Sequence, residues 1–181
     1  MNATRAAMLA TLLVALTVAA GQALAAVPNV ELVTFLVFVS GYLLGARLGA
    51  AVGATAMGIH SLFNVMGAAV PPVLATQVAV YAGVGVAGAL AGPAIARAGP
   101  GLPTSLRALA VGAALTLGYQ LAVNAAAFYA FTGAAGLWAY LWGGVAFGVV
   151  HIVWNALLFT VALRPALAVL SRHRDRAGAS P

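Results

Sequence analysis

Long apolar stretches follow one another along the chain, and short breaks that contain proline, glycine or polar residues separate them. The stretches are rich in alanine and leucine and lack the roughly ten-residue alternation of transmembrane β-strands. An apolar run of about 20 residues can cross the hydrocarbon core of a bilayer as an α-helix. The breaks fall at Pro28-Asn29, Gly45-Ala46-Arg47, Gly67 to Pro72, Gly92 to Pro103 and Thr132-Gly133. The pattern predicts an all-α polytopic membrane protein, a bundle of six transmembrane helices at residues 6–27, 32–46, 48–64, 73–92, 107–131 and 137–164.

Some of the predicted spans have alternative interpretations. The second and third are short, and a single hairpin-like unit around Arg47 could replace them. The first also fits a signal peptide, because Arg5 and an apolar stretch precede Ala23-Leu24-Ala25, which has the form of a cleavage site. Its apolar run is longer than the roughly 7–15 residues of a signal peptide, which favours a retained helix. We predict a single membrane domain over residues 1–181, in which residues 165–181 form a basic tail.

The composition narrows the class of protein. Of the 181 residues, 64% are hydrophobic and 6% are charged, and the mean hydropathy is +1.08. Soluble domains carry roughly 25% charged residues, so this chain could not cover its own surface in water. Cysteine is absent, which excludes disulfides, thiolate metal ligands and cysteine nucleophiles.

The net charge of +6 comes from arginines that share one side of the predicted bundle. These residues are Arg5, Arg47, Arg97, Arg107, Arg164, Arg172, Arg174 and Arg176. Because positively charged loops are retained in the cytoplasm, we predict a multi-pass protein of the inner (plasma) membrane with both termini cytoplasmic. We predict that the basic tail lies against anionic lipid head groups and does not bind nucleic acid.

Polar side chains gather in the outer half of the predicted bundle, where most come in pairs four residues apart. This spacing places both members of a pair on one helix face. The predicted substrate-binding residues are Asn29, Glu31, His60, Asn64, Gln77, Tyr81, Gln120, Asn124, Tyr140, His151 and Asn155. A polar side chain in hydrocarbon is costly unless it faces a cavity or another polar group, so these residues either line a pocket or join helices by hydrogen bonds. Their gathering in one leaflet favours a polar pocket that opens outward.

The sequence lacks the patterns of several kinds of chemistry. It has no nucleotide-binding loop, no Gly-x-Ser-Gly turn, no His-Glu-x-x-His motif and no pair of intramembrane carboxylates. We therefore predict that the protein is not an enzyme and has no catalytic residue, metal site or cofactor. His60 and His151 could ligate a haem or corrinoid metal, but a histidine inside a membrane protein more often forms hydrogen bonds.

Three segments resemble a known family. They are Pro28–Thr34 (PNVELVT), Ser40–Gly49 (SGYLLGARLG) and His151–Phe159 (HIVWNALLF). With the size of the chain and the six-helix plan, they are similar to the substrate-binding S components of energy-coupling factor (ECF) transporters, the vitamin and micronutrient importers of prokaryotes. The resemblance extends from the first predicted span to the last. The chain departs from the family at Ala46, where we expect proline, and at Phe147-Gly148, where related members often have an acidic residue.

The resemblance implies a binding protein that captures a vitamin or related small solute outside the cell. It implies a transmembrane coupling subunit and two ATPase subunits as partners that power uptake. In this family, small residues of the first and third helices contact the coupling subunit, and the comparable residues here are Ala6, Ala10, Gly49 and Gly53. Small residues at this spacing let helix backbones approach closely, so they could instead lie in the chain's own core. Cobalamin-like, thiamine-like and modified-nucleobase cargo all stay open.

Two other classes of function are alternatives: an autonomous small-solute transporter or channel, and a structural or assembly membrane protein. A symporter predicts inverted repeats and buried ionisable groups, and a channel predicts rings of pore-lining residues. The sequence shows neither pattern. A structural role gives no reason for polar pairs to gather in one leaflet.

Overall fold

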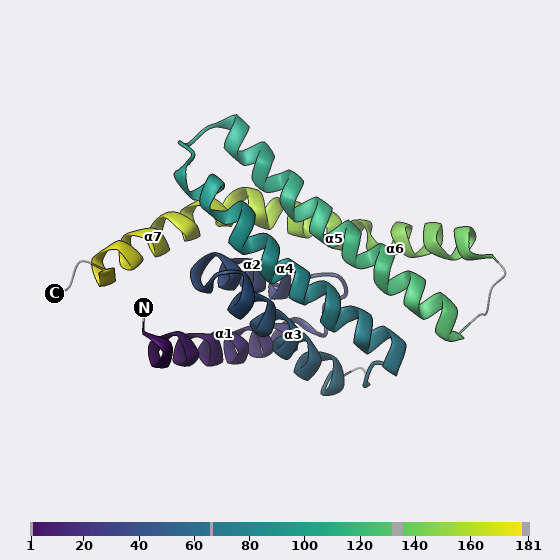
Figure 1. Ribbon diagram of the computed structural model, residues 1–181. Coiled ribbons are helices and arrows are strands. Elements are labelled where there is room, and N and C mark those ends of the chain that lie inside the picture. Colours follow the sequence, from purple (N-terminus) through teal and green to yellow (C-terminus); the bar gives the residue numbers. More distant parts are fainter. Residues whose placement is uncertain (1, 66, 132–135, 179–181) are drawn as a thin grey trace.

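The computed structural model describes residues 2–65, 67–131 and 136–178, without the side chains of residues 145–147 and 172–178. The described chain is all-helical, as the sequence predicts (Figure 1). Its elements are α1 (Ala3–Leu24), α2 (Val33–Leu44), α3 (Ala46–Leu62), α4 (Pro71–Arg97), α5 (Leu102–Phe131), α6 (Leu137–Leu158), the π-helical turn η1 (Phe159–Leu163) and α7 (Arg164–Gly178). The predicted break at Thr132-Gly133 and the side chains of Arg172, Arg174 and Arg176 lie outside the described part.

Four apolar helical segments of the described chain are long enough to cross a membrane: α1, α4, α5 and Gly148–Ser171, which runs through η1. The wider turn of η1 comes just before Pro165, which has no backbone N–H to donate. By contrast, α2 has 12 residues and a length of about 18 Å, less than the roughly 30 Å of a hydrocarbon core. The fold is consistent with a helical membrane protein, in which two of the predicted spans, α2 and the 17-residue α3, are shorter than the hydrocarbon core.

The short helix α2 lies in the core of the bundle. Most of its side chains are buried, and it contacts α1, α3 and α4. Phe35 and Phe38 pack edge-on against Phe159 of η1, with ring centroids 5.6 and 5.3 Å apart. After α2, Gly45 (φ 81°) reverses the chain, in a conformation that glycine adopts without strain. α2 and α3 therefore form a helical hairpin.

Glycines allow α3 to pack directly against α2 and α4. A Cβ added at Gly53 would overlap the carbonyl of Tyr81. One added at Gly49 would overlap the backbone of Gly41 and approach that of Gly85. Gly49 and Gly53, which the resemblance assigns to a contact with a coupling subunit, are buried between the chain's own helices.

The helix α1 presents two different faces. Ala6 and Ala10 are half-buried, on the face that also carries the buried Leu13 and Thr17. The opposite face is exposed and carries large apolar side chains such as Leu12. The two alanines therefore lie on the side of α1 that faces the bundle.

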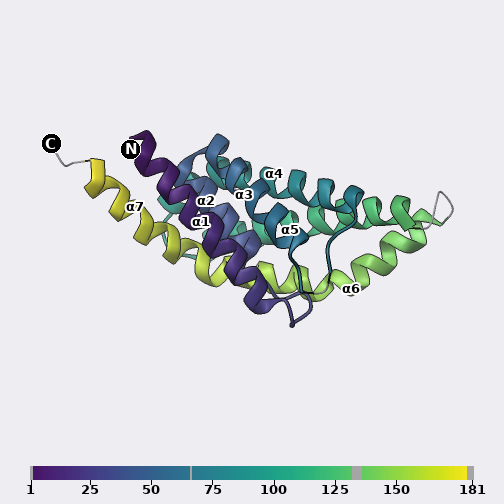
Figure 2. The same ribbon diagram turned by 90° about the horizontal axis from the view of Figure 1, so that it is seen from below.

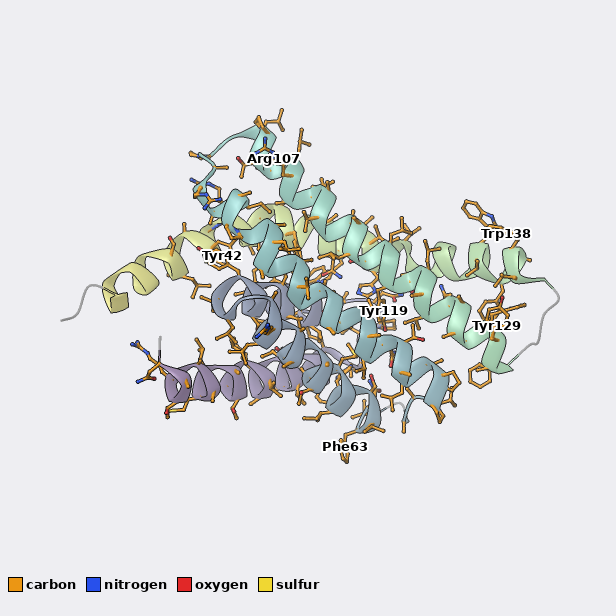
Figure 3. All side chains as sticks on the ribbon, in the orientation of Figure 1. Tyr42, Phe63, Arg107, Tyr119, Tyr129 and Trp138 are labelled. Carbon is orange, nitrogen blue, oxygen red and sulfur yellow. The ribbon has the colours of Figure 1, made fainter. Side chains whose placement is uncertain are left out.

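The two ends of the described chain lie at the same end of the bundle. There α1 begins and α7 ends, beside the α2–α3 and α4–α5 connections, whereas the α1–α2 connection and the end of α5 lie toward the opposite end (Figures 1 and 2). Arg164 Nε donates to the carbonyl of Ala98 in the α4–α5 connection at 3.4 Å. The other arginines with described side chains lie near the helix ends that meet here: Arg5, Arg47, Arg97 and Arg107 (Figure 3). We call this the arginine end.

The outside of the bundle is apolar. Large hydrophobic side chains project from several helices, among them Leu90 of α4 (74% exposed) and Trp138 of α6 (75% exposed; Figure 3). Soluble monomers rarely expose continuous apolar surface on this scale. The surface suits a lipid environment.

Candidate solute-binding site

A buried carboxylate lies at the centre of the candidate site. The α1–α2 connection directs the Glu31 side chain into the bundle, toward α6. Asn155 Nδ2 (2.7 Å) and His151 Nε2 (3.2 Å) of α6 donate hydrogen bonds to its Oε1 atom. The backbone N–H of Thr34 donates to its Oε2 atom at 2.8 Å. One side chain thus joins the connection, the start of α2 and the C-terminal part of α6.

The position of Glu31 favours its charged form. The residue precedes α2, and the backbone N–H groups at a helix start stabilise a carboxylate. Burial raises the pKa of Glu31, but the hydrogen bonds from His151 and its other donors outweigh burial and hold the pKa below its ordinary value. The carboxylate is therefore ionised at neutral pH.

His151 connects Glu31 to α5. Its Nδ1 atom lies 3.3 Å from Gln120 Nε2, and an amide nitrogen can only donate, so Nδ1 accepts. The ring proton is then on Nε2, the atom that faces Glu31. His151 thus links Glu31 of the α1–α2 connection to Gln120 of α5.

Two adjoining cavities, of about 230 and 320 Å³, lie beside Glu31. Both are lined by Glu31, Val33, His60, Asn64, Tyr119 and His151. The smaller one, here the α4-side cavity, is also lined by Met57, Ser61, Gly67, Ala69, Gln77 and Tyr81. The larger one, here the α1-side cavity, is also lined by the end of α1, by Ala25, by residues 27–30 and by Gln120, Val123 and Asn124. Because the α1–α2 and α3–α4 connections contribute to the lining, the cavities lie toward the end of the bundle opposite the arginine end.

The α4-side cavity has an aromatic wall. The rings of Tyr81 and Tyr119 meet edge to face at 5.4 Å, and Tyr119 meets the His151 ring at 5.8 Å. Tyr119 lies in the middle of the bundle (Figure 3). The Tyr81 hydroxyl is 3.1 Å from Thr34 Oγ1, and Gln77 Nε2 donates to the Tyr119 hydroxyl at 3.1 Å. These hydrogen bonds fix the orientation of both rings.

Three polar atoms of cavity-lining residues have no hydrogen-bond partner among the described residues: Gln77 Oε1, His60 Nδ1 and Asn124 Nδ2. His60 Nε2 accepts from Asn64 Nδ2 at 3.3 Å, so in the neutral ring Nδ1 carries the proton. A polar atom that is buried without a partner costs about 1–3 kcal/mol. Two of these atoms lie close to glycines of neighbouring helices: His60 Nδ1 is near Gly21 of α1, and Asn124 Nδ2 is near Gly144 of α6.

Most of the predicted substrate-binding residues come together at the cavities. Those that line one or both are Asn29, Glu31, His60, Asn64, Gln77, Tyr81, Gln120, Asn124 and His151. The structure does not place the other two there. Asn155 is fully buried, lines neither cavity and donates a hydrogen bond to Glu31. Tyr140 lies three turns before His151 on α6, and its ring packs 5.5 Å from that of Phe128.

The sequence pattern does not predict two residues of the site. Tyr119 lines both cavities. It is not part of the pair Gln120 and Asn124, from which it lies about 100° around the helix. Trp154 Nε1 donates to the backbone carbonyl of Glu31 at 2.7 Å. Both residues could have been predicted from a tyrosine hydroxyl or a tryptophan N–H in the middle of a predicted span, because such a group needs a hydrogen-bond partner when it is buried.

The side chains at the site can donate and accept hydrogen bonds. They are one carboxylate, two imidazoles, several amides and two phenols, beside a few apolar residues. Ligand sites commonly combine an apolar lining with a small number of such polar groups. Among the described residues, no group of three or more His, Asp or Glu side chains could hold a metal ion.

Comparison with known proteins finds no match. No protein-family model matches the chain, and no curated protein and no solved structure matches it. The function is therefore inferred from the geometry of the site and from the segments that resemble ECF S components.

Proposed function

We propose that the protein is the substrate-binding S component of an ECF-type importer in the plasma membrane of a prokaryote. It captures a vitamin or related small solute from outside and holds it in the two cavities beside Glu31. Six helical segments cross the membrane, and both termini are cytoplasmic. A transmembrane coupling subunit and two ATPase subunits power the uptake, because the chain has no nucleotide-binding loop of its own.

The observation that carries this proposal is the pair of adjoining cavities around Glu31. They lie inside a bundle with an apolar exterior, and polar side chains from four helices and the α1–α2 connection line them. Their volumes, about 230 and 320 Å³, approach the lower end of the roughly 300–1,000 Å³ of ligand pockets. The polar residues that line the cavities come from elements far apart in the chain, such as Glu31 of the α1–α2 connection and His151 of α6.

The positions of the charges support the proposed orientation. Arginine-rich ends are retained in the cytoplasm, so the arginine end faces inward. The cavities lie toward the other end, and in the proposed orientation they open to the outside. A solute could then enter from outside without crossing the bundle.

The test has two parts that use the full chain. Small molecules that co-purify with the protein in detergent are identified by mass spectrometry, and uptake of that solute is measured in cells with and without an ECF coupling subunit and its ATPases. We expect wild type and Tyr140→Phe to retain the solute, and Gln77→Leu to lose most of it, because Tyr140 lies outside the cavities. Uptake without the coupling subunit would favour an autonomous transporter, and retention of no solute would contradict the binding function.

A further inference from the structure

We infer that the solute is a small planar heterocycle with a cationic or amino group, whose N–H donors are directed at Glu31 and Gln77. This inference rests on the proposed function and narrows it. The proposed function requires only that some solute binds, whereas the polarity and the size of the solute follow from the cavities.

Among the described residues that line the cavities, Glu31 is the one acidic side chain, and no lysine or arginine is present. Glu31 is ionised, and its donors are a side-chain amide, a backbone N–H and an imidazole whose other nitrogen accepts from Gln120. The chain contains no lysine, and the arginines with described side chains lie at the arginine end. A buried charge is costly unless it is paired, so the site favours a cationic solute and disfavours an anionic one.

The acceptors of the α4-side cavity match a donor group with two N–H bonds. Glu31 accepts two hydrogen bonds on Oε1 and one on Oε2, out of about four acceptor positions on a carboxylate. About one position therefore remains on Oε2. Gln77 Oε1 is the second acceptor, and the amide is held in this orientation because its Nε2 donates to Tyr119. An amino or amidinium group could donate to both oxygens.

The walls of the same cavity favour a flat ring. Tyr81 and Tyr119 form one side, and the apolar side chains of Val33 and Met57 also line it. Aromatic faces attract cations as well as other rings. A positively charged heterocycle would gain from both kinds of contact.

The volumes limit the size of the solute. The two adjoining cavities, of about 230 and 320 Å³, lie near the lower end of the roughly 300–1,000 Å³ of ligand pockets. A solute of one or two rings fits this space, and a corrinoid macrocycle does not. Of the three kinds of cargo that the sequence leaves open, the thiamine-like and nucleobase-like ones agree with the cavities.

The test uses three pyridines of similar size that differ in charge at neutral pH: the cation of 4-aminopyridine, neutral isonicotinamide and the anion isonicotinate. Their affinities for the full chain in lipid nanodiscs are measured by titration, with cobalamin as a large probe. We expect 4-aminopyridine to bind roughly tenfold or more tightly than isonicotinamide, because charge-assisted hydrogen bonds are about twice as strong as neutral ones. Isonicotinate should bind most weakly, and cobalamin should not bind.

Two substitutions test the residues. Glu31→Gln should remove most of the preference for 4-aminopyridine. Because Glu31 also joins α2 to α6, this variant could fail to fold, and Gln77→Glu is the second variant. It adds a carboxylate that can accept a hydrogen bond from the Tyr119 hydroxyl, and it should increase the preference for the cation several-fold. A Gln77→Glu protein without this increase would contradict the predicted orientation of the solute.

The possible outcomes separate the two proposals. Equal affinities for the three pyridines, or tighter binding of isonicotinate, would overturn the inference on polarity. Tighter binding of cobalamin than of any pyridine would overturn the inference on size. If no pyridine binds but the protein retains another solute on purification, the inference fails and the proposed function stands. If nothing binds and nothing is retained, both fail.

Discussion

Glu31 joins the start of α2 to α6, and the same carboxylate lines both cavities. A change at this residue therefore affects the fold and the site together. The chain has only two acidic side chains, Glu31 and Asp175. The response of the protein to acid can thus be traced to very few groups.

We predict that the melting temperature of the wild-type protein in detergent falls as the pH is lowered from about 6 to about 3. The pKa of Glu31 is below its ordinary value in the folded protein, so the unfolded chain takes up the proton first. The stability from this carboxylate is present above about pH 4.3, the ordinary carboxyl value, and is lost as the pH falls through the lower folded pKa. Glu31→Gln should lose most of this pH dependence, and Asp175→Asn should keep it. If the melting temperature of Glu31→Gln falls with pH as steeply as that of the wild type, the role of Glu31 is contradicted.

Asn155 and Gln77 separate stability from binding. Asn155→Ala removes a buried donor from Glu31 and should lower the free energy of unfolding by about 1–3 kcal/mol. Gln77→Leu removes an acceptor at the cavity, and it should weaken binding of the co-purifying solute a few-fold to about tenfold. Thermal unfolding without the solute and titration with it measure the two effects. A larger loss of affinity in Asn155→Ala than in Gln77→Leu would contradict the positions of these residues.

At the residue scale, the sequence predicts which polar residues gather but not how they all pair. The four-residue spacing places His60 beside Asn64, and this contact is present at 3.3 Å. By contrast, Glu31 meets His151 and Asn155 across 120 and 124 positions of the chain. Helical periodicity relates residues of one helix, so it contains no information on such a contact.

The packing of α3 against α4 depends on glycine at particular positions. A Cβ at Gly85 would overlap the carbonyl of Gly49, whereas a Cβ at Gly83, two positions earlier on α4, would meet no atom within 4 Å. Alanine favours a helix over glycine by about 1 kcal/mol. Gly83→Ala should therefore be neutral or stabilising, and Gly85→Ala should cost about 1–3 kcal/mol because of overpacking. Melting temperatures of the two variants provide the comparison, and equal values would contradict the close helix contact.

At the scale of elements, composition predicts where the helices lie better than what they meet. The apolar sequence of α2 is typical of a lipid-facing span, but burial inside a protein core favours the same residues. Similarly, Gly49 and Gly53 predict a close helix contact, and the contact exists. A ladder of small residues has the same spacing whether it faces its own chain or another protein, so the sequence alone could not assign the partner.

For the whole molecule, we predict that reporter fusions after Arg97 and after Arg176 both report the cytoplasm, and that a fusion after Gly67 reports the outside. The reason is that the helix ends rich in arginine lie together, and positive charge is retained inside. Fusions after Arg97 and Arg176 that report opposite sides would contradict the six-crossing topology.

The charge pattern predicts that the arginines lie at one end. Successive connections between helices lie at alternate ends of a bundle, so the end at which an arginine lies follows from the order of the helices alone. The cavities depend on how far the helices tilt and where glycines let them approach. These quantities are set by packing in three dimensions, so the sequence predicts the presence of a polar site but neither its volume nor its division into two cavities.

The central claim is that a solute-accessible cavity enters the bundle from the side opposite the arginine end. Because the chain contains no cysteine, Ser61→Cys places a single thiol at the α4-side cavity. Ser40→Cys is the control, since Ser40 is fully buried in α2 and lines neither cavity. A membrane-impermeant thiol reagent added to intact cells should label Ser61→Cys, more slowly when the solute is present, and should leave Ser40→Cys unlabelled. Labelling of Ser61→Cys only after the membrane is broken, or labelling that the solute does not slow, would contradict the claim.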